Sequence, residues 1–338
     1  MRSNQTRLST SHGQPGELDL ISQIRARAEQ VSGATLRLGI GDDCAVLRPR
    51  RSEELAITTD LSIAGRHFRL DWHPPQSVGH RALARGLSDL AAMGARPIAA
   101  FLSLGLPREL TKPSGRQAAW VESFLDGLLA LAAACETPLA GGDLCEAPFA
   151  VADIVLVGGV ARGKALLRST ARPGHLLYVT GSLGGAAAAL DSLAKLQPRR
   201  IGKKLEAQLA PHLYPQPRIA QGQWLVRHGI ACAAIDISDG LSTDPAHLCK
   251  ESGVAAEVDA ALLPIQAAAS LDQALNGGED YELLFTAAAS ARIPKRIGGV
   301  AVTRIGRILP LRRNRSTIAL LTHQGPQQLN PKGWQHFS

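Results

Sequence analysis

The chain is poor in aromatic residues and has no long apolar run. Phe, Trp and Tyr make up 4% of its 338 residues, and no motif of a known nucleic-acid reader is present, so we expect no nucleic-acid partner. Phe149–Val160 is among the longest apolar segments, yet Asp153 and glycines interrupt it, so we expect no membrane partner. Residues 1–16 are polar and lack the apolar centre of a secretory signal, which predicts a flexible leader.

Cysteines are few, scattered and odd in number. The five are Cys44, Cys135, Cys145, Cys232 and Cys249, with no C-x-x-C pair among them. This pattern argues against a disulfide framework or a zinc site and favours a reducing, cytoplasmic location. We interpret Cys44 as a small core residue rather than a reactive thiol.

What the chain does contain is typical of a soluble globular protein with two domains. It is 45% hydrophobic and 20% charged, with 33 glycines and 20 prolines that follow no fixed period. The net charge is +8, and short basic clusters lie at Arg48–Arg51, Arg199–Lys204 and Arg312–Arg315. We interpret these clusters as solvated loops, although a basic balance also suits anionic substrates.

Hydrophobic periodicity predicts alternating helices and strands in both halves of the chain. The predicted helices cover Glu17–Val31, Pro75–Gly94, Ser114–Cys135, Ala186–Leu196, Pro217–Gly229 and Leu241–Ser252. The predicted strands cover Leu38–Leu47, Leu55–Thr59, Ile98–Leu106, Pro138–Ala140, Phe149–Val160, Leu176–Thr180, Cys232–Ile237, Tyr281–Ala287 and Val300–Ile308. A polar, turn-rich stretch near residue 163 predicts domains at 17–162 and 163–338, both α+β with mixed sheets flanked by helices.

Two adjacent carboxylates, Asp42 and Asp43, lie inside the apolar stretch Leu38–Leu47. Burying an uncompensated carboxylate costs several kcal/mol, so each acid in a buried strand would need a partner. Either a turn at Gly41 lets one Asp cap backbone amides, or the pair belongs to a cation site.

Similar acids recur beside glycines or at strand ends: Asp60, Asp89, Asp143, Asp236, Asp239, Glu279 and Asp280. Each has a structural explanation taken alone. Asp89 is four residues from Arg85 and suits a helix-face ion pair, Asp60 suits a turn, and Asp236 and Asp239 could cap the following helix. Together they favour hard divalent cations, and several Mg²⁺ ions would imply a polyphosphate substrate.

Two glycine-rich segments bear on phosphate binding. Residues 158–164 match G-x-x-x-x-G-K, but Ala165 follows where a P-loop needs Ser or Thr, so we reject a P-loop. Gly181–Gly185 lies between a predicted strand and helix, and suits either a phosphate at the helix N-terminus or a tight turn.

The acid-rich segments resemble, in content and in order, those of the thiamine-monophosphate kinase family, within the superfamily typified by aminoimidazole ribonucleotide synthetase. The matching segments are GIGDDCAVL, TTDLSIAGRHF, LSDLAAMGA, LAGGDL, IDISDGLSTD, GGEDYELLF and KGWQHF, and the resemblance runs from about Glu17 to Phe337. The resemblance implies the two-domain fold of the aminoimidazole ribonucleotide synthetase superfamily and transfer of the ATP γ-phosphate to thiamine monophosphate. It also implies a homodimer whose N-terminal sheets pair across a two-fold axis.

The resemblance also implies roles for particular residues. The implied Mg²⁺ ligands are Asp43, Thr58, Thr59, Asp60, Asp89, Asp143, Asp236 and Asp239. The implied ATP contacts are Gly142, Asp143, Arg168 and Ser238, and the implied thiamine-side contacts are His67, Glu279 and Trp334. Asp42 is then left to the turn. One departure is that Leu144, Cys145 and Glu146 follow GGD, where the family commonly has threonines.

A phosphate nucleophile is already ionised near neutral pH, so we expect direct transfer with no general base and no phosphoenzyme. Two other interpretations stay open. One is another ATP-using enzyme of the superfamily, such as a selenophosphate synthetase or a hydrogenase-maturation enzyme; the absence of cysteine before Cys44 and after Cys249 counts against both. The other is a catalytically silent nucleotide-binding scaffold, which only the +8 charge favours.

Overall fold

The structure is a computed structural model that describes residues 17–31, 33–113, 119–197, 201–312 and 317–333. Its helices are α1 (Glu17–Ala28), α2 (Pro75–Ala92), α3 (Trp120–Ala134), α4 (Gly185–Leu196), α5 (Lys203–Leu213), α6 (Ile219–His228), α7 (Asp244–Ser252) and α8 (Leu271–Asn276). Its strands are β1 (Leu36–Leu38), β2 (Val46–Leu47), β3 (Glu53–Ile63), β4 (Arg96–Leu106), β5 (Leu139–Glu146), β6 (Val151–Ala161), β7 (Leu176–Thr180), β8 (Ala231–Ile237), β9 (Val254–Asp259), β10 (Glu282–Ala287), β11 (Arg296–Ile297), β12 (Val300–Pro310), β13 (Ile318–Thr322) and β14 (Gly325–Gln328).

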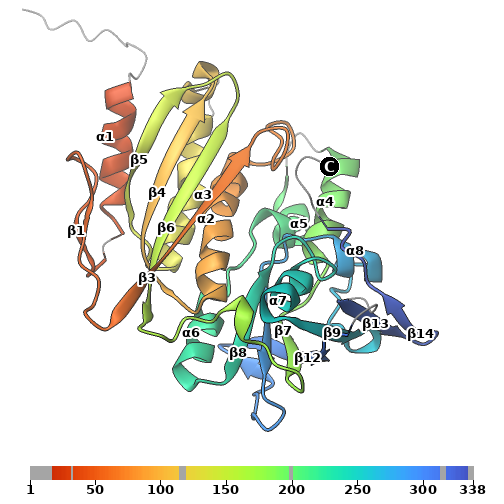
Figure 1. The fold of residues 1–338 in the computed structure, drawn as a ribbon. Helices are drawn as coiled ribbons and strands as arrows, with labels where there is room; N and C mark the ends of the chain where they lie inside the picture. Colours follow the sequence, from red (N-terminus) through yellow and green to blue (C-terminus); the bar gives the residue numbers. More distant parts are fainter. Residues whose placement is uncertain (1–16, 32, 114–118, 198–200, 313–316, 334–338) are drawn as a thin grey trace, which may run out of the picture.

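The N-terminal half is a four-stranded mixed sheet with strand order β3-β6-β4-β5, in which only β4 and β5 are parallel. Strand alternation divides β3 cleanly. Thr58, Asp60 and Ser62 point to the helix side, whereas Leu55 and Ile57 are exposed on the other face. Helices α2 and α3 cover the inner face, and the β1–β2 ribbon packs on part of the outer face (Figure 1).

The C-terminal half contains a larger sheet with strand order β14-β13-β9-β12-β7-β10-β8, and β11 pairs with β12. All its pairs are antiparallel except β13 with β9, so both sheets are mixed. The predicted α+β fold with two mixed sheets and flanking helices is therefore confirmed. The boundary near residue 163 stays a prediction.

Helix α2 joins the two halves, because it packs on α3, β3 and β6 of the first and on α6, β8 and β10 of the second. Pro75 lies in its first turn, and Gly94 with φ +68° follows its end, as the sequence predicted. Glycines allow its close crossings. A Cβ on Gly127 of α3 would lie 1.8 Å from the Gln76 carbonyl oxygen, and one on Gly222 of α6 would lie 2.0 Å from the Ala91 carbonyl oxygen.

Three sequence expectations need correction. Leu38–Leu47 is not one buried strand: β1 and β2 are short and flank a loop in which Asp42, Asp43 and Cys44 are exposed. The predicted burial cost therefore does not arise, and Cys44 is not a core residue. The strand expected to end at Ala140 continues as β5 through Glu146 because it pairs with β4 along its whole length.

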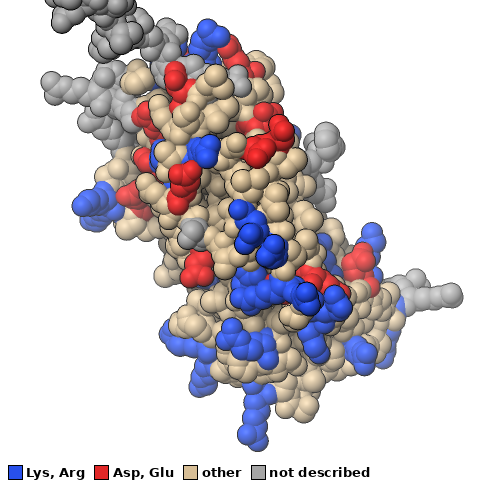
Figure 2. All heavy atoms as spheres, turned by 90° about the vertical axis from the view of Figure 1, so that its left-hand side faces the viewer, with Lys and Arg blue, Asp and Glu red and all other residues tan. Residues whose placement is uncertain are grey.

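Other expectations hold or fall outside the described chain. Residues 158–161 of the rejected P-loop match lie within strand β6. The leader at 1–16 and the first residues of the helix predicted from Ser114 lie outside the described residues. Within the described chain no helix is both long enough and apolar enough to cross a membrane. On the face drawn in Figure 2, Lys and Arg gather mainly over the lower part, which is the C-terminal half.

Candidate active site

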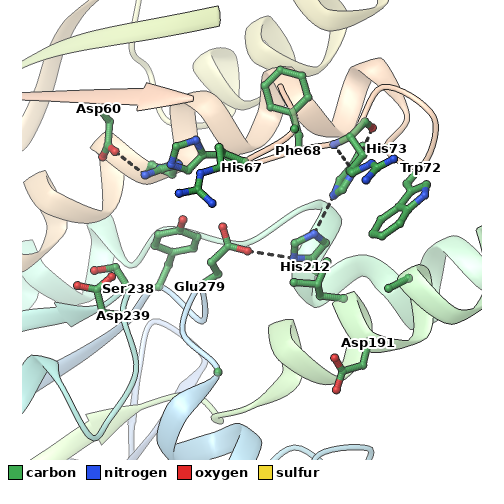
Figure 3. Close-up of a pocket in the computed structure, with 18 of the residues that line it drawn as sticks. Asp60, His67, Phe68, Trp72, His73, Asp191, His212, Ser238, Asp239 and Glu279 are labelled. Atoms are coloured by element: carbon green, nitrogen blue, oxygen red, sulfur yellow. Dashed lines mark hydrogen bonds and ion pairs between the residues drawn. The ribbon is translucent and has the colours of Figure 1, made fainter. Parts of the chain in front are cut away.

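A cavity of about 490 Å³ lies between the two halves and is lined by both. From the N-terminal half come the end of β3, the loop from Gly65 to His73, and α2. From the C-terminal half come α4, α5 and the loops that follow β8 and α8. Figure 3 shows Asp60 and His67 above the cavity, with Ser238, Asp239 and Glu279 below them. Five predicted site residues far apart in sequence therefore meet at one place.

Helix α2 supplies a row of polar side chains on the cavity side. Arg81, Arg85 and Asp89 follow one another at intervals of four residues, and Ser88 comes three residues after Arg85, which places them on one side of the helix. Arg85 pairs with Asp60 on β3 at 2.9 Å, not with Asp89 on its own helix. The helix-face ion pair considered for Asp89 is therefore not formed. Asp89 instead accepts a hydrogen bond from Thr58.

Three acids that line this cavity are short of positive charge: Asp236 is buried, and Asp60 and Asp89 are half-buried. Burial raises the pKa of Asp60 to about 6, against the lowering effect of Arg85. Burial, and then the Asp89 carboxylate, raises the pKa of Asp236 to about 7. The pKa of Asp89 is also raised by burial, although Thr58 and Arg168 oppose the shift. Arg168 thus acts on both Asp89 and Asp236 electrostatically.

The β8–α7 loop, which carries Ser238 and Asp239, is held by a single buried carboxylate. Asp244 Oδ2 accepts hydrogen bonds of 3.0 Å from the backbone amides of Ser238, Asp239 and Gly240. Burial, and then Asp236 and Asp239, raises the pKa of Asp244 to about 8. Asp236 and Asp239 therefore do not cap α7, which begins at Asp244 rather than at Leu241.

The acids of the GGEDYE segment each have a different partner. Glu279 Oε1 is 2.5 Å from Arg81, and its Oε2 is 3.2 Å from His212. Asp280 Oδ2 accepts from the Gly184 amide at 2.7 Å, and its Oδ1 accepts from the Ala186 amide at 3.2 Å. Glu282 pairs with Arg218 at 2.5 Å. Burial of the Glu279 carboxyl would raise its pKa, but Arg81 and then His212 hold it well below its ordinary value.

Asp280 also decides between the two interpretations of Gly181–Gly185. A carboxylate of the chain itself occupies the N-terminus of α4, where a phosphate would otherwise bind the same amides. The glycine-rich segment is therefore a strand-to-helix turn. This turn is closed by the motif that also carries Glu279.

The remaining predicted residues lie elsewhere. Asp43, Gly142 and Asp143 line a second cavity of about 790 Å³ beside β4 and β5, apart from the acids on α2 and β8. Asp42 accepts a hydrogen bond of 2.9 Å from the Asp43 amide, as the turn interpretation predicted. Thr59 lies on the outer face of β3 and donates to Asp153 at 3.0 Å. Trp334 lies outside the described residues.

Several lining residues were missed from the sequence. Arg85, Tyr281, His73 and His212 all line the main cavity, and Arg81 contacts Glu279 just behind it. The spacing of Arg81, Arg85 and Asp89 on one predicted helix was a usable signal. His212 gave none, because α5 was not predicted: Pro211 within its last turn suggests a break rather than a helix.

Comparison with known proteins assigns the family. The models of the AIR synthase related protein N-terminal and C-terminal domains match residues 41–165 and 172–318. Thiamine-monophosphate kinase of Escherichia coli (strain K12) is 39% identical over 335 residues, which cover 96% of this chain and 98% of that protein. The chain belongs to the thiamine-monophosphate kinase family. The Bacillus subtilis (strain 168) member is 29% identical over 340 residues, 95% of this chain and 99% of that protein.

Solved structures agree with this membership of the thiamine-monophosphate kinase family. The enzyme from Stenotrophomonas maltophilia K279a is 38% identical with a TM-score of 0.75, covering 90% of this chain and 96% of that chain. AaThiL complexed with AMPPCP and TMP is 29% identical with a TM-score of 0.72, covering 98% and 100%. The hydrogenase maturation protein HypE in complex with ATP has a TM-score of 0.72 at 17% identity over 96% and 97% of the chains, which shows a shared fold alone.

Proposed function

We propose that this chain is a thiamine-phosphate kinase, which transfers the γ-phosphate of ATP to thiamine monophosphate and forms thiamine diphosphate and ADP. One observation supports this most directly. The cavity between the halves gathers Asp60 and Asp89 from one half with Asp236, Asp239 and Glu279 from the other. The AaThiL complex, a family member with AMPPCP and TMP bound, supports the same two substrates.

The two substrates are assigned to different groups of residues. ATP is assigned to Ser238 and Arg168, together with Gly142 and Asp143 of the second cavity. The thiamine side is assigned to His67, Glu279 and Trp334. The Ile63 amide donates to His67 Nδ1 at 3.0 Å, which fixes that ring. Glu279, whose pKa is lowered, offers a negative charge to the cationic thiazolium ring.

The acidic side chains of the main cavity are chemically suited to Mg²⁺, although they are not arranged around a single ion position. No group of three His, Cys, Asp or Glu side chains within the described chain lies close enough to hold a metal. The acids nevertheless offer hard oxygen ligands, and Asp60, Asp89 and Asp236 lack full compensation, as their raised pKa values indicate. We assign Mg²⁺ to these three with Asp239, and to Thr58, Asp43 and Asp143 by family resemblance. Thr59 is not assigned, because it faces away from the cavity and donates to Asp153. Bound Mg²⁺ would supply positive charge that offsets the repulsion between the two phosphates.

The chain's own contribution to catalysis is positioning and charge. The attacking phosphate oxygen is already ionised near neutral pH, so no residue is assigned as a general base. Arg85 and Arg168 place positive charge beside the acids that face the phosphates. Asp244 fixes the loop that carries Ser238, and Arg81 fixes Glu279. The transfer is direct and in line, without a phosphoenzyme.

A homodimer and a cytoplasmic location complete the proposal. The outer face of the four-stranded sheet leaves Leu55, Ile57 and Leu61 exposed by 47%, 66% and 45%, which suits pairing with the same face of a second copy. All five cysteines are free thiols, in keeping with a reducing compartment. Sedimentation tests the dimer. We expect the wild type to sediment as two copies of the chain and Ile57→Lys, which places a charge on this face, to sediment as one copy. A monomeric wild type would refute it.

Phosphorus NMR of ATP and thiamine monophosphate with the purified protein tests the reaction. We expect thiamine diphosphate and ADP in equal amounts, and no product from Asp236→Asn. Asp126→Asn, an exposed acid on α3 far from the cavity, is the matched control and should turn over normally. ATP binding without thiamine diphosphate would leave a nucleotide-binding scaffold instead. Label from [γ-³²P]ATP on the protein would refute direct transfer.

A further inference from the structure

Glu279 is held unusually firmly for an acid at the edge of a cavity. Arg81 contacts one carboxylate oxygen at 2.5 Å, and His212 faces the other at 3.2 Å. Its backbone has φ +57°, a left-handed conformation that non-glycine residues rarely adopt. Its amide donates to the Ser238 carbonyl oxygen at 2.8 Å. The position of this carboxylate is thus coupled to the loop assigned to ATP.

Behind Glu279, two buried histidines form a line that ends at its carboxylate (Figure 3). His212 Nε2 is 3.0 Å from His73 Nε2, and His73 Nδ1 is 3.0 Å from the Arg69 amide nitrogen. Burial, and then Arg81, lowers the pKa of both rings, that of His73 to about 3. Both rings are therefore neutral, and each carries a single ring proton.

One arrangement of the two protons satisfies both 3.0 Å contacts and also places a proton between His212 and Glu279. The Arg69 amide donates to His73 Nδ1, so His73 carries its proton on Nε2 and donates it to His212 Nε2. His212 must then carry its proton on Nδ1, the ring nitrogen that lies 3.2 Å from a Glu279 carboxylate oxygen. In the opposite arrangement His73 Nδ1 would donate to the Arg69 carbonyl oxygen at 3.2 Å. An unprotonated His212 Nδ1 would then face an anion, which is repulsive.

From this geometry we propose that His212 is a positioning residue for the substrate, and that His73 acts through it by fixing its tautomer. Together they hold the Glu279 carboxylate toward the thiazolium of thiamine monophosphate. The inference rests on the proposed function for the identity of the substrate. The proton arrangement of the two histidines does not depend on the proposed function, because it is a property of the protein without substrate.

The proton arrangement is tested directly by nitrogen NMR of protein labelled with ¹⁵N-histidine. We expect His212 as the Nδ1–H tautomer, the less common form in water, and His73 as the Nε2–H tautomer. The two signals are assigned by their loss in His212→Asn and His73→Gln. A His212 ring protonated on Nε2 would overturn the proposal, whether or not the protein proves to be a kinase.

Kinetics test the positioning role. His212→Phe keeps the ring volume but removes Nδ1–H; we expect the KM for thiamine monophosphate to rise roughly tenfold, with kcat and the KM for ATP nearly unchanged. His212→Asn, whose amide can replace Nδ1–H, should recover most of the affinity. His80→Phe is the matched control. His80, which lies on α2, is buried like His212, but its ring contacts the Pro215 carbonyl oxygen and not Glu279. We expect its KM values to match those of the wild type.

A double-mutant cycle separates coupling from general damage. If His73 acts only through His212, adding His73→Leu to His212→Phe should not raise the KM further, although His73→Leu alone raises it. Additive effects, or an unchanged KM in folded His212→Phe, would refute the positioning role while leaving the kinase assignment intact. If the wild type showed no turnover of thiamine monophosphate, the kinase assignment would be refuted, but the result on the histidine tautomers would still hold.

Discussion

Ser88 Oγ on α2 donates a hydrogen bond of 2.7 Å to Asp236 Oδ2 on β8. Both residues are buried, so a neutral hydroxyl from one half of the chain is the hydrogen-bonding partner of a buried acid from the other. A neutral donor does not balance a negative charge, and the nearby Asp89 makes the deficit larger. The free protein therefore keeps unfavourable electrostatics at the place where Mg²⁺ is proposed to bind.

This repulsion predicts that Asp89→Asn is more stable than the wild type yet inactive. The amide can still accept from Thr58, while the charge that raises the pKa of Asp236 is lost. We expect the Tm in EDTA to rise by about 2–4 °C and turnover to fall at least ~100-fold. Calorimetry and the coupled kinase assay measure the two effects. A lower Tm would show that Asp89 is stabilising in the free protein.

The two adjacent threonines of β3 should behave differently. Thr58 donates to Asp89 inside the cavity, whereas Thr59 donates to Asp153 on the outer face. We expect Thr58→Val to lower kcat about tenfold through loss of a hydrogen bond to a charged group. Thr59→Val should stay within about twofold and serves as the matched control. Equal losses in both variants would contradict this assignment of faces.

The crossing of α2 and α3 predicts a large stability effect at one glycine. Because a Cβ on Gly127 would lie 1.8 Å from the Gln76 carbonyl oxygen, Gly127→Ala must push the helices apart. We expect a loss of about 2–3 kcal/mol in the free energy of unfolding, measured by urea denaturation. Ala130→Ser, at an exposed position of the same helix, should change it little.

Asp280 predicts a pH-dependent stability effect. Burial raises its pKa to about 7 in the folded protein, against 3.8 for an ordinary aspartate carboxyl. Its contribution is therefore fully present below about pH 4 and is lost as the pH rises through 7. Asp280→Asn does not titrate, so its stability relative to the wild type should increase between pH 5 and pH 8, on the order of 1 kcal/mol.

Urea denaturation in EDTA at the two pH values measures this difference. The exposed Glu251→Gln should show no such change relative to the wild type. A constant difference between Asp280→Asn and the wild type across this range would mean that Asp280 is ionised throughout.

The sequence predicted the elements with clear periodicity and the acids that meet in the main cavity. Helix α2 was found with its Pro75 start and Gly94 end because both residues have local conformational reasons to be there. Strand β9 was not found, since its alanine-rich sequence VAAEVD is stable as a strand only between β12 and β13.

The sequence also could not predict that the expected site residues are divided between two cavities. Asp43 and Asp89 lie in motifs of the same kind, and nothing local distinguishes the cavity that each one lines. The partners of Glu279 are 198 residues away in the case of Arg81, and 67 residues away in the case of His212. Such pairs are set by the packing of the halves, which no local pattern encodes.

The shared position of α2 has a consequence for how substrates enter. A hinge rotation between the halves would break the close backbone contact between Gly222 and Ala91. It would also expose the apolar side chains of the last turn of α2, which pack against the C-terminal half. We therefore expect the halves to stay fixed through each catalytic cycle. Admission of thiamine monophosphate would then fall to the exposed residues Gly65, Arg66 and Arg69 at the rim, so that local loop opening, and not closure of two lobes, sets the rate of exchange.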